Sequence, residues 1–267
     1  MTFDLGPALL FCPADRPERF AGALAKADAV ILDLEDAVLP DAKAQARENL
    51  LAADVDPARV IVRVNDPASA FFSADLEAVS RTPFRTVMVA KVEDPAALDA
   101  FDETFSLLAL CETAAGVQRA GEIAAHPRVA ALMWGAEDLV ASIGGSSSRF
   151  PDGRYREVAR HARSTVLIAA AAHGKAAIDA VHLDIDDLDG LAAEAADAVA
   201  SGFRATACIH PKQVAAIRDA YRPDPAAVEW ARAVLAAAEG EHGVFRFDGR
   251  MVDEPVLRHA RAVLSRV

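Results

Sequence analysis

The chain has 267 residues, of which 53% are hydrophobic and 25% charged, and its formal net charge is −12. This hydrophobicity excludes a disordered chain, and the length is sufficient for a large hydrophobic core without disulfide or metal staples. The acidic balance argues against a nucleic-acid binder or a protein of anionic membranes, because both need a positive surface. A small anionic ligand held by a few local arginines remains compatible with it.

Cysteine usage and targeting signals indicate the compartment. Cys12, Cys111 and Cys208 lie in or beside apolar runs, so we expect reduced, buried thiols in a cytoplasmic protein. No basic stretch leads into an apolar core at the N-terminus, as it would in a signal peptide. No apolar run reaches the about 18 residues of a membrane span, so no membrane partner is expected.

Short apolar, β-branched runs alternate with longer Ala-rich segments of helical periodicity. Eight of these runs are too short for helices and are bounded by Pro, Gly, Asp or Asn, so we predict strands. Most are apolar at nearly every position, which is typical of parallel strands covered on both faces. Strands alternating with helices in this number predict a (β/α)8 TIM barrel. The predicted strands are residues 8–12, 29–34, 60–64, 86–92, 107–111, 129–134, 176–183 and 205–209.

Helical periodicity also sets the predicted domain boundary. Pro17 is a first-turn proline with Asp15 as its N-cap, and Gly202 ends a helix that begins near residue 187. The chain beyond the last strand contains more helix than a barrel needs. We therefore predict a TIM-barrel catalytic domain at 1–220 and a C-terminal helical cap at 221–267.

Polar residues follow most of the predicted strands. In a TIM barrel the reactive groups lie at the C-terminal ends of the strands, so these residues should converge on one mouth. His182 is expected inside the seventh strand, buried and hydrogen-bonded, and Asp184 at the end of that strand. The other strand-end segments are residues 33–36, 63–65, 91–93, 112–113, 135–138 and 210–211.

Glu112 and Asp138 follow adjacent predicted strands and suit a hard divalent cation. Mg²⁺ keeps several waters and uses only one or two protein carboxylates, which leaves positions for substrate oxygens. Each carboxylate could instead face the positive end of a helix dipole, Asp138 more readily than Glu112, but together they favour a metal. No His/Cys cluster is present, so zinc and iron are not expected.

Two arginines and a histidine have both structural and functional interpretations. Arg63 ends an apolar strand and must be paired, either in a salt bridge to Glu35 or Asp36 or as a clamp on a substrate oxygen. Arg16 lies in the first strand-to-helix loop, where it could meet a phosphate or remain a solvated charge. His210 follows the last strand and could be a structural hydrogen-bonding residue or part of the site.

Five separated segments resemble the citrate lyase β-subunit-like (CitE-like) proteins of the HpcH/HpaI aldolase and malyl-CoA lyase superfamily. The resemblance extends in order over nearly the whole chain. The segments are LFCPADRPERF at 10–20, ILDLEDAV at 31–38, GAEDL at 135–139, CIHPKQV at 208–214 and GRMVDEP at 249–255.

The resemblance implies a Mg²⁺-dependent TIM barrel that acts on CoA thioesters. It implies that Glu112 and Asp138 are the metal ligands and that Arg63 holds the substrate carbonyl or carboxylate. Glu35 and Asp36 would surround metal-bound water.

The resemblance also implies a substrate channel and an assembly. Phe11 and Arg16 would contact the CoA, and Ile209 and His210 would line its channel. In relatives the cap reaches a neighbouring subunit and supplies an acid/base carboxylate, here Asp253, which implies a homotrimer or a hexamer built from trimers.

The implied reaction is carbon–carbon cleavage of a 3-hydroxyacyl-CoA with a second carboxylate, of the malyl-, citramalyl- or citryl-CoA type. The products would be an acyl-CoA and an α-keto acid. A malyl- or citramalyl-CoA thioesterase, or a malate-synthase-like enzyme, would use the same residues. A non-catalytic subunit of a lyase complex is a further alternative, against which the complete set of Glu112, Asp138, Arg63 and Asp253 argues.

Overall fold

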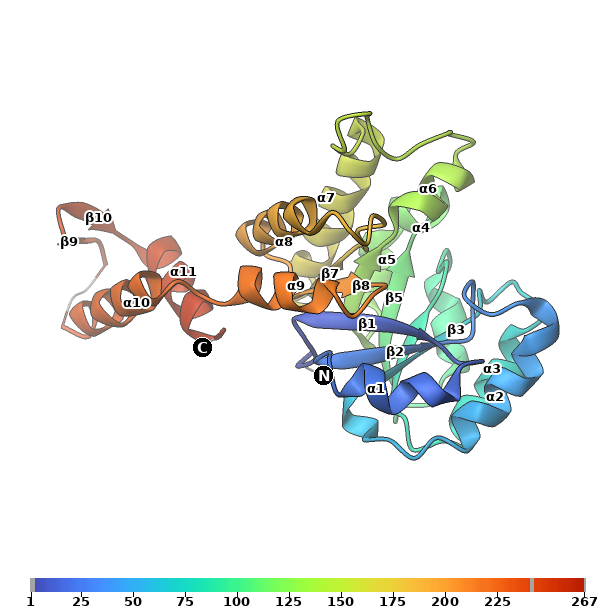
Figure 1. Cartoon of the computed structure of the whole chain (residues 1–267). Helices are drawn as coiled ribbons and strands as arrows, with labels where there is room; N and C mark the ends of the chain where they lie inside the picture. Colours follow the sequence, from blue (N-terminus) through green and yellow to red (C-terminus); the bar gives the residue numbers. More distant parts are fainter. Residues whose placement is uncertain (1–2, 241–242, 267) are drawn as a thin grey trace. The chain divides into compact units, whose positions relative to one another are not determined.

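The computed structural model describes residues 3–240 and 243–266. Eight parallel strands pair in sequence order and β1 closes on β8, so the predicted (β/α)8 barrel is confirmed (Figure 1). The strands are β1 (Ala8–Pro13), β2 (Ala29–Asp33), β3 (Val60–Val64), β4 (Thr86–Val89), β5 (Ser106–Cys111), β6 (Val129–Trp134), β7 (Ala176–Asp179) and β8 (Ala205–Cys208).

Helices cover the outside of the barrel (Figure 1). Pro17 opens the first 3-10 helix as predicted, but Arg16 and not Asp15 is its N-cap, and no side chain caps it. Gly202 ends α8 in the left-handed conformation at φ +110°, which glycine adopts without steric cost. The α-helices of the barrel are α1 (Phe20–Leu24), α2 (Lys43–Leu51), α3 (Phe72–Ser80), α4 (Ala114–Gln118), α5 (Ala120–Ala125), α6 (Ala136–Ser142), α7 (Glu157–Ala172) and α8 (Leu188–Ser201). Short 3-10 helices are η1 (Pro17–Arg19), η2 (Pro40–Ala42), η3 (Pro57–Arg59) and η4 (Pro95–Ala100).

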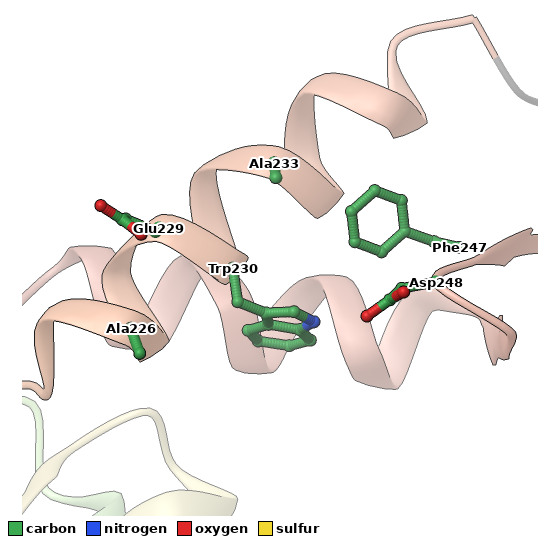
Figure 2. Close-up of a pocket in the computed structure, with 6 residues that line it drawn as sticks. All are labelled: Ala226, Glu229, Trp230, Ala233, Phe247 and Asp248. Atoms are coloured by element: carbon green, nitrogen blue, oxygen red, sulfur yellow. The ribbon is translucent and has the colours of Figure 1, made fainter.

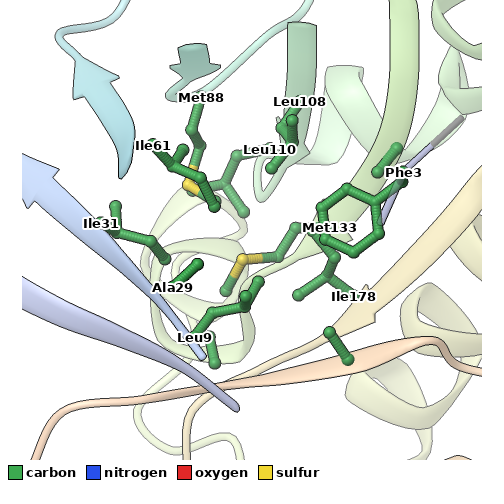
Figure 3. Close-up of a cluster of buried hydrophobic side chains, with 13 residues drawn as sticks. Phe3, Leu9, Ala29, Ile31, Ile61, Met88, Leu108, Leu110, Met133 and Ile178 are labelled. Atoms are coloured by element: carbon green, nitrogen blue, oxygen red, sulfur yellow. The ribbon is translucent and has the colours of Figure 1, made fainter. Parts of the chain in front are cut away.

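The barrel interior is filled by every second residue of the strands. Ile31, Ile61, Leu110 and Met133 are buried there and point toward one another (Figure 3). Alternation along a strand sends the intervening residues outward against the helices, so both faces are apolar. Two positions beyond these interior residues the inward rows reach Asp33, Arg63, Glu112 and Gly135. The strand period that builds the core therefore also aims the polar residues at the mouth.

Two strands, β4 and β7, end three or four residues earlier than the sequence predicts. β4 ends at Val89 instead of residue 92, because Lys91 adopts a left-handed backbone with φ +50° that breaks the extended chain. β7 ends at Asp179 instead of residue 183. His182 is buried as predicted but lies in the following loop. Asp184 accepts backbone N–H bonds from residues 186 and 187, so it shapes a turn.

The chain divides into two compact units, Met1–Ile217 and Arg218–Val267. The second unit has its own core, which includes Ala231, Val252 and Ala260, and a cavity of about 500 Å³ beside Trp230 and Phe247 (Figure 2). Its short β9–β10 hairpin was not predicted. The last residue of the predicted helical cap, residue 267, lies outside the described residues. The remaining elements are α9 (Gln213–Tyr221), α10 (Pro225–Ala238), β9 (Phe245–Phe247), β10 (Arg250–Val252) and α11 (Glu254–Leu264).

The structure also describes the three cysteines and the helices that a membrane span would require. Cys12, Cys111 and Cys208 are all buried thiols that form no disulfide, as expected. Burial raises the pKa of the Cys111 thiol to about 12. Within residues 3–240 and 243–266, no helix has the length and apolar character needed to cross a membrane.

Candidate active site

A cavity of about 250 Å³ lies at the C-terminal ends of the barrel strands. Seven of its lining residues come from six strand ends and carry the chemistry predicted for the mouth of the barrel. Apolar walls from Leu110, Met133, Ala180, Val181 and Leu183 complete it. The seven are Phe11, Asp33, Asp36, Arg63, Glu112, Asp138 and Ile209.

Arg63 is fixed by two carboxylates at the floor of this cavity. Its Nε and Nη2 donate to the two oxygens of Asp33, each at 2.6 Å, and its Nη1 lies 3.1 Å from Glu35 Oε2. Of the two partners predicted for Arg63, Glu35 is confirmed, whereas Asp36 pairs with Lys91 instead. Burial opposes the Arg63 charge, but Asp33 and Glu35 outweigh it and raise the arginine pKa.

Phe11 packs beneath the guanidinium. The Arg63 Cζ lies 4.7 Å from the centroid of the Phe11 ring, which is a cation–π geometry. The aromatic face and the ion pairs together leave Arg63 one orientation, aimed into the cavity.

Glu112 is the most buried carboxylate of the cavity after Asp33. Burial and the nearby charge of Asp138 raise its pKa well above the ordinary range. Its Oε1 accepts the backbone N–H of Lys91 at 3.2 Å. A side chain at Gly135 would place its Cβ 2.6 Å from Glu112 Oε2, so only glycine leaves space for this carboxylate.

An acidic pair follows β2. Glu35 and Asp36 both accept hydrogen bonds from the Lys91 ammonium, Asp36 at 2.9 Å. Burial raises the pKa of Glu35 although Arg63 and Lys91 oppose it. Burial also acts on the more open Asp36, but the bonds from Lys91 outweigh it and lower the Asp36 pKa.

Hydrogen bonds from Lys43 and Asn65 hold the backbone of the loop that carries this acidic pair. The Lys43 ammonium donates to the carbonyls of Leu34 and Glu35 at 2.7 and 2.9 Å. Asn65 donates to the Leu34 carbonyl at 3.0 Å and to Asp75. Buried donors on buried carbonyls leave this loop little freedom, because breaking them would strand polar groups away from water.

Four predicted site residues are not among those that line the cavity: Glu35, whose contacts are given above, and Arg16, His210 and Asp253. Arg16 is exposed and lies 3.8 Å from its neighbour Asp15. His210 accepts the backbone N–H of Lys212 on Nδ1, which is the structural alternative considered for it. Asp253 caps α11 in the second unit by accepting the Val256 N–H at 3.3 Å.

No role was predicted for Asp33 and Lys91, two residues that organise the cavity. The signal for Asp33 is available in the strand register. Asp33 and Arg63 stand opposite each other on neighbouring strands, and both continue the inward row of their strand. No local pattern identifies Lys91, because its contacts come from segments that are distant in sequence.

The donor set fits a hard divalent cation. Glu112 and Asp138 are like charges close enough for one to raise the pKa of the other, and a cation between them would offset that repulsion. Among the described residues, no three His, Cys, Asp or Glu side chains group as metal ligands. A two-carboxylate site is the arrangement in which Mg²⁺ retains water and substrate oxygens.

A family model described as HpcH/HpaI aldolase/citrate lyase matches residues 8–211. The chain belongs to this family. The superfamily inferred from the five motifs is thereby confirmed. The chain is 54% identical over 261 residues to a citrate lyase subunit beta-like protein of Mycobacterium tuberculosis, covering 98% of this chain and 95% of the relative.

Other relatives of the chain carry more specific names. The chain is 31% identical to a mitochondrial citramalyl-CoA lyase of Rattus norvegicus, over 90% of this chain and 79% of the relative. It is 36% identical to a (3S)-malyl-CoA thioesterase of Cereibacter sphaeroides, over 90% of this chain and 86% of the relative.

A solved structure supports the same relationship. The crystal structure of CitE from Mycobacterium tuberculosis in complex with magnesium, acetoacetate and coenzyme A superposes with a TM-score of 0.91. The two chains are 53% identical, and the match covers 98% of each. The family and the barrel are therefore shown by sequence and structure alike.

Proposed function

We propose that this protein is a Mg²⁺-dependent carbon–carbon lyase of a 3-hydroxyacyl-CoA with a second carboxylate, of the citramalyl-, malyl- or citryl-CoA type. The observation that carries the proposal is the buried carboxylate Glu112 beside Asp138 and Arg63 in one cavity at the barrel mouth. Support comes from the family, from the relative named citramalyl-CoA lyase, and from the related structure in complex with magnesium, acetoacetate and coenzyme A.

Glu112 and Asp138 are the proposed ligands of the magnesium ion. When bound, the ion would act as a Lewis acid and as a template for the keto-acid end of the substrate. Gly135 and the Lys91 N–H hold the Glu112 carboxylate in place for this role.

Arg63 is the proposed partner of the substrate carbonyl or carboxylate. A guanidinium has five N–H donors, and the contacts with Asp33 and Glu35 engage three of its nitrogens without using every hydrogen. We propose that the remaining donors bind a substrate oxygen in the cavity that Arg63 lines. Fixed donors aimed at an oxygen that gains negative charge lower the barrier without reorganisation.

The reaction needs two proton transfers. The substrate hydroxyl loses its proton, the bond between the hydroxyl-bearing carbon and the carbon next to the thioester breaks, and its electron pair stays as a thioester enolate. Protonation of that carbon releases the acyl-CoA, and the other fragment leaves as the α-keto acid. We assign the acid/base role to Asp253 of a neighbouring copy in a homotrimer or hexamer, with Glu35 and Asp36 as the polar surroundings of the metal.

The CoA is proposed to approach along one side of the mouth. Phe11 and the half-exposed Ile209 line the cavity and offer apolar contacts, and His210 follows Ile209. The exposed Arg16 on the β1–α1 loop is the proposed phosphate contact, because an exposed guanidinium pairs well with phosphate.

Thioester hydrolysis is the second candidate, favoured by the 36% identity to the malyl-CoA thioesterase. The same cavity would serve both reactions, since the enolate and the thioester carbonyl occupy the same end of the substrate. Free CoA together with the intact hydroxy acid identifies hydrolysis, and free CoA formed from an α-keto acid and acetyl-CoA identifies the malate-synthase-like reaction.

The test is a mass-spectrometric turnover screen of the purified protein with malyl-, citramalyl- and citryl-CoA, with Mg²⁺ and with EDTA. Metal-dependent release of a shorter acyl-CoA and a keto acid is the expected result. Glu112→Gln and Asp138→Asn should lose turnover and Mg²⁺ binding, whereas Glu93→Gln, which changes an exposed carboxylate after β4, should retain both. Full turnover by both ligand variants would refute the metal assignment.

A further inference from the structure

Lys91 occupies an unusual position just beyond β4. Its backbone φ is +50°, a left-handed conformation that residues other than glycine, asparagine and aspartate rarely adopt. Its side chain is only 21% exposed, so the ammonium lies largely inside the barrel mouth. A long, charged side chain in a strained backbone position must be held there by its contacts.

Those contacts are three carboxylates from two different strand ends. The Lys91 ammonium binds Glu35, lies 2.9 Å from Asp36 Oδ2 and lies 3.3 Å from Asp138 Oδ1. An ammonium has three N–H donors, which is one for each of these carboxylates. The backbone N–H of the same residue donates to Glu112. Lys91 therefore touches both proposed metal ligands and the acidic pair.

The balance of charges at the barrel mouth explains why the Lys91 ammonium lies beside these carboxylates. Arg63 is already committed to Asp33 and Glu35, so it leaves Asp138 and Asp36 without a positive partner among its contacts. Like carboxylates at close range destabilise each other, most strongly where water is excluded. Within residues 3–240 and 243–266, the Lys91 ammonium is the cation that pairs with Asp138, at 3.3 Å from its Oδ1.

We propose that Lys91 is a positioning residue that acts as the internal counter-cation of the metal site. It neutralises Asp138 until a divalent cation binds, and it then stays with Glu35 and Asp36. This inference rests on the proposed function, in which Glu112 and Asp138 hold the metal. Lys91 should therefore have two opposite effects. It stabilises the cluster of carboxylates when no metal is bound, and it weakens metal binding because its charge competes for Asp138.

The experiment measures Mn²⁺ affinity by electron paramagnetic resonance and the melting temperature of the metal-free full chain. Lys91→Met should bind Mn²⁺ about tenfold more tightly, because a nearby positive charge is removed, and its metal-free Tm should fall. Lys26→Met is the matched control, since it makes the same charge change on an exposed residue before β2, at the opposite end of the barrel. Lys26→Met should leave both values unchanged.

A second variant covers the case in which Lys91→Met fails to fold. Lys91→Gly also lacks the ammonium but accepts the left-handed backbone, and it should bind Mn²⁺ more tightly as well. Equal or weaker Mn²⁺ binding by the folded Lys91 variants, with normal binding by the wild type, overturns the counter-cation role alone. Absence of Mn²⁺ binding to the wild type overturns both this role and the proposed metal site.

Discussion

Asp33 and Arg63 face each other across β2 and β3 and form a bidentate ion pair in which both N···O distances are 2.6 Å. Asp33 is completely buried and also accepts the backbone N–H groups of Glu35 and Ala37. Removing two charges from water is costly, and only near-ideal geometry with further hydrogen bonds offsets that cost. The pair thus couples the stability of the barrel mouth to the direction in which Arg63 points.

Asp33→Ala should therefore destabilise the protein strongly. We expect a loss of about 3–5 kcal/mol in the free energy of unfolding, because the substitution leaves an uncompensated buried arginine. Urea unfolding measures it, with the exposed Asp54→Ala as a charge-matched control that should stay within about 0.5 kcal/mol. The double variant Asp33→Leu, Arg63→Met should regain part of the stability and stay inactive. A stable, fully active Asp33→Ala protein would contradict the coupling.

Gly135→Ala should impair the site without disturbing the barrel. The new Cβ would lie 2.6 Å from Glu112 Oε2 and 2.9 Å from Glu112 Cβ, so the carboxylate must move. The backbone φ of Gly135 is −130°, which any residue adopts, so the effect is steric. We expect weaker Mn²⁺ binding and turnover lower by about 100-fold, since a misplacement of about 1 Å has that effect.

Gly121→Ala is the matched control for this substitution. Nothing lies within 4 Å of its added Cβ, and Gly121 sits in α5. Because alanine favours helix more than glycine by about 1 kcal/mol, this control should be equally or more stable, with normal metal affinity. Unchanged Mn²⁺ affinity in Gly135→Ala would show that Glu112 is not constrained as described.

Stability should depend on pH through His182. Its Nδ1 lies 2.9 Å from Glu194, and this hydrogen bond raises the pKa of His182 above its ordinary 6.5, against burial and the charge of Arg149. Asp187 adds to the rise. A raised pKa in the folded state means that the protonated histidine stabilises the fold. This contribution is complete below pH 6.5 and is lost as the pH rises through the folded-state pKa.

Thermal melts from about pH 6 to about pH 9 measure this contribution. The wild type should lose Tm across the range, by about 2–4 °C for each 1 kcal/mol, and Glu194→Gln should flatten the slope. Glu157→Gln removes an exposed carboxylate that pairs with Arg160 and should keep the wild-type slope. A slope that persists in Glu194→Gln would assign the pH dependence to another group.

Complementation tests whether Asp253 acts in a neighbouring copy. Asp253→Asn and Arg63→Ala should each be inactive alone. When the two are refolded together, some sites combine an intact Arg63 with an intact Asp253 of another chain, and activity should return to about one quarter of the wild type. Mixing without refolding is the control. If the mixed protein stays inactive, Asp253 does not serve a neighbouring barrel in this way.

Hydrophobic patterning alone predicted the eight strands and the barrel. A parallel strand buried on both faces must be apolar at nearly every position, so a short local run of residues is enough to predict its burial. The same logic placed Glu112, Asp138 and Arg63 at strand ends, which a barrel brings to one mouth. The motifs then added the family, because they occur in order over nearly the whole chain.

The tertiary structure decided the partners and the strand ends. Nothing near Lys91 in sequence shows that its backbone turns left-handed after β4, because the carboxylates that hold it follow β2 and β6. The sequence predicted Glu35 or Asp36 as the ion-pair partner of Arg63. In the structure the strand register pairs Arg63 with Asp33, and Glu35 is the second partner. Local patterning fixes what a residue must bury, whereas ion pairing depends on distances of about 3 Å between groups that only the closed barrel brings together.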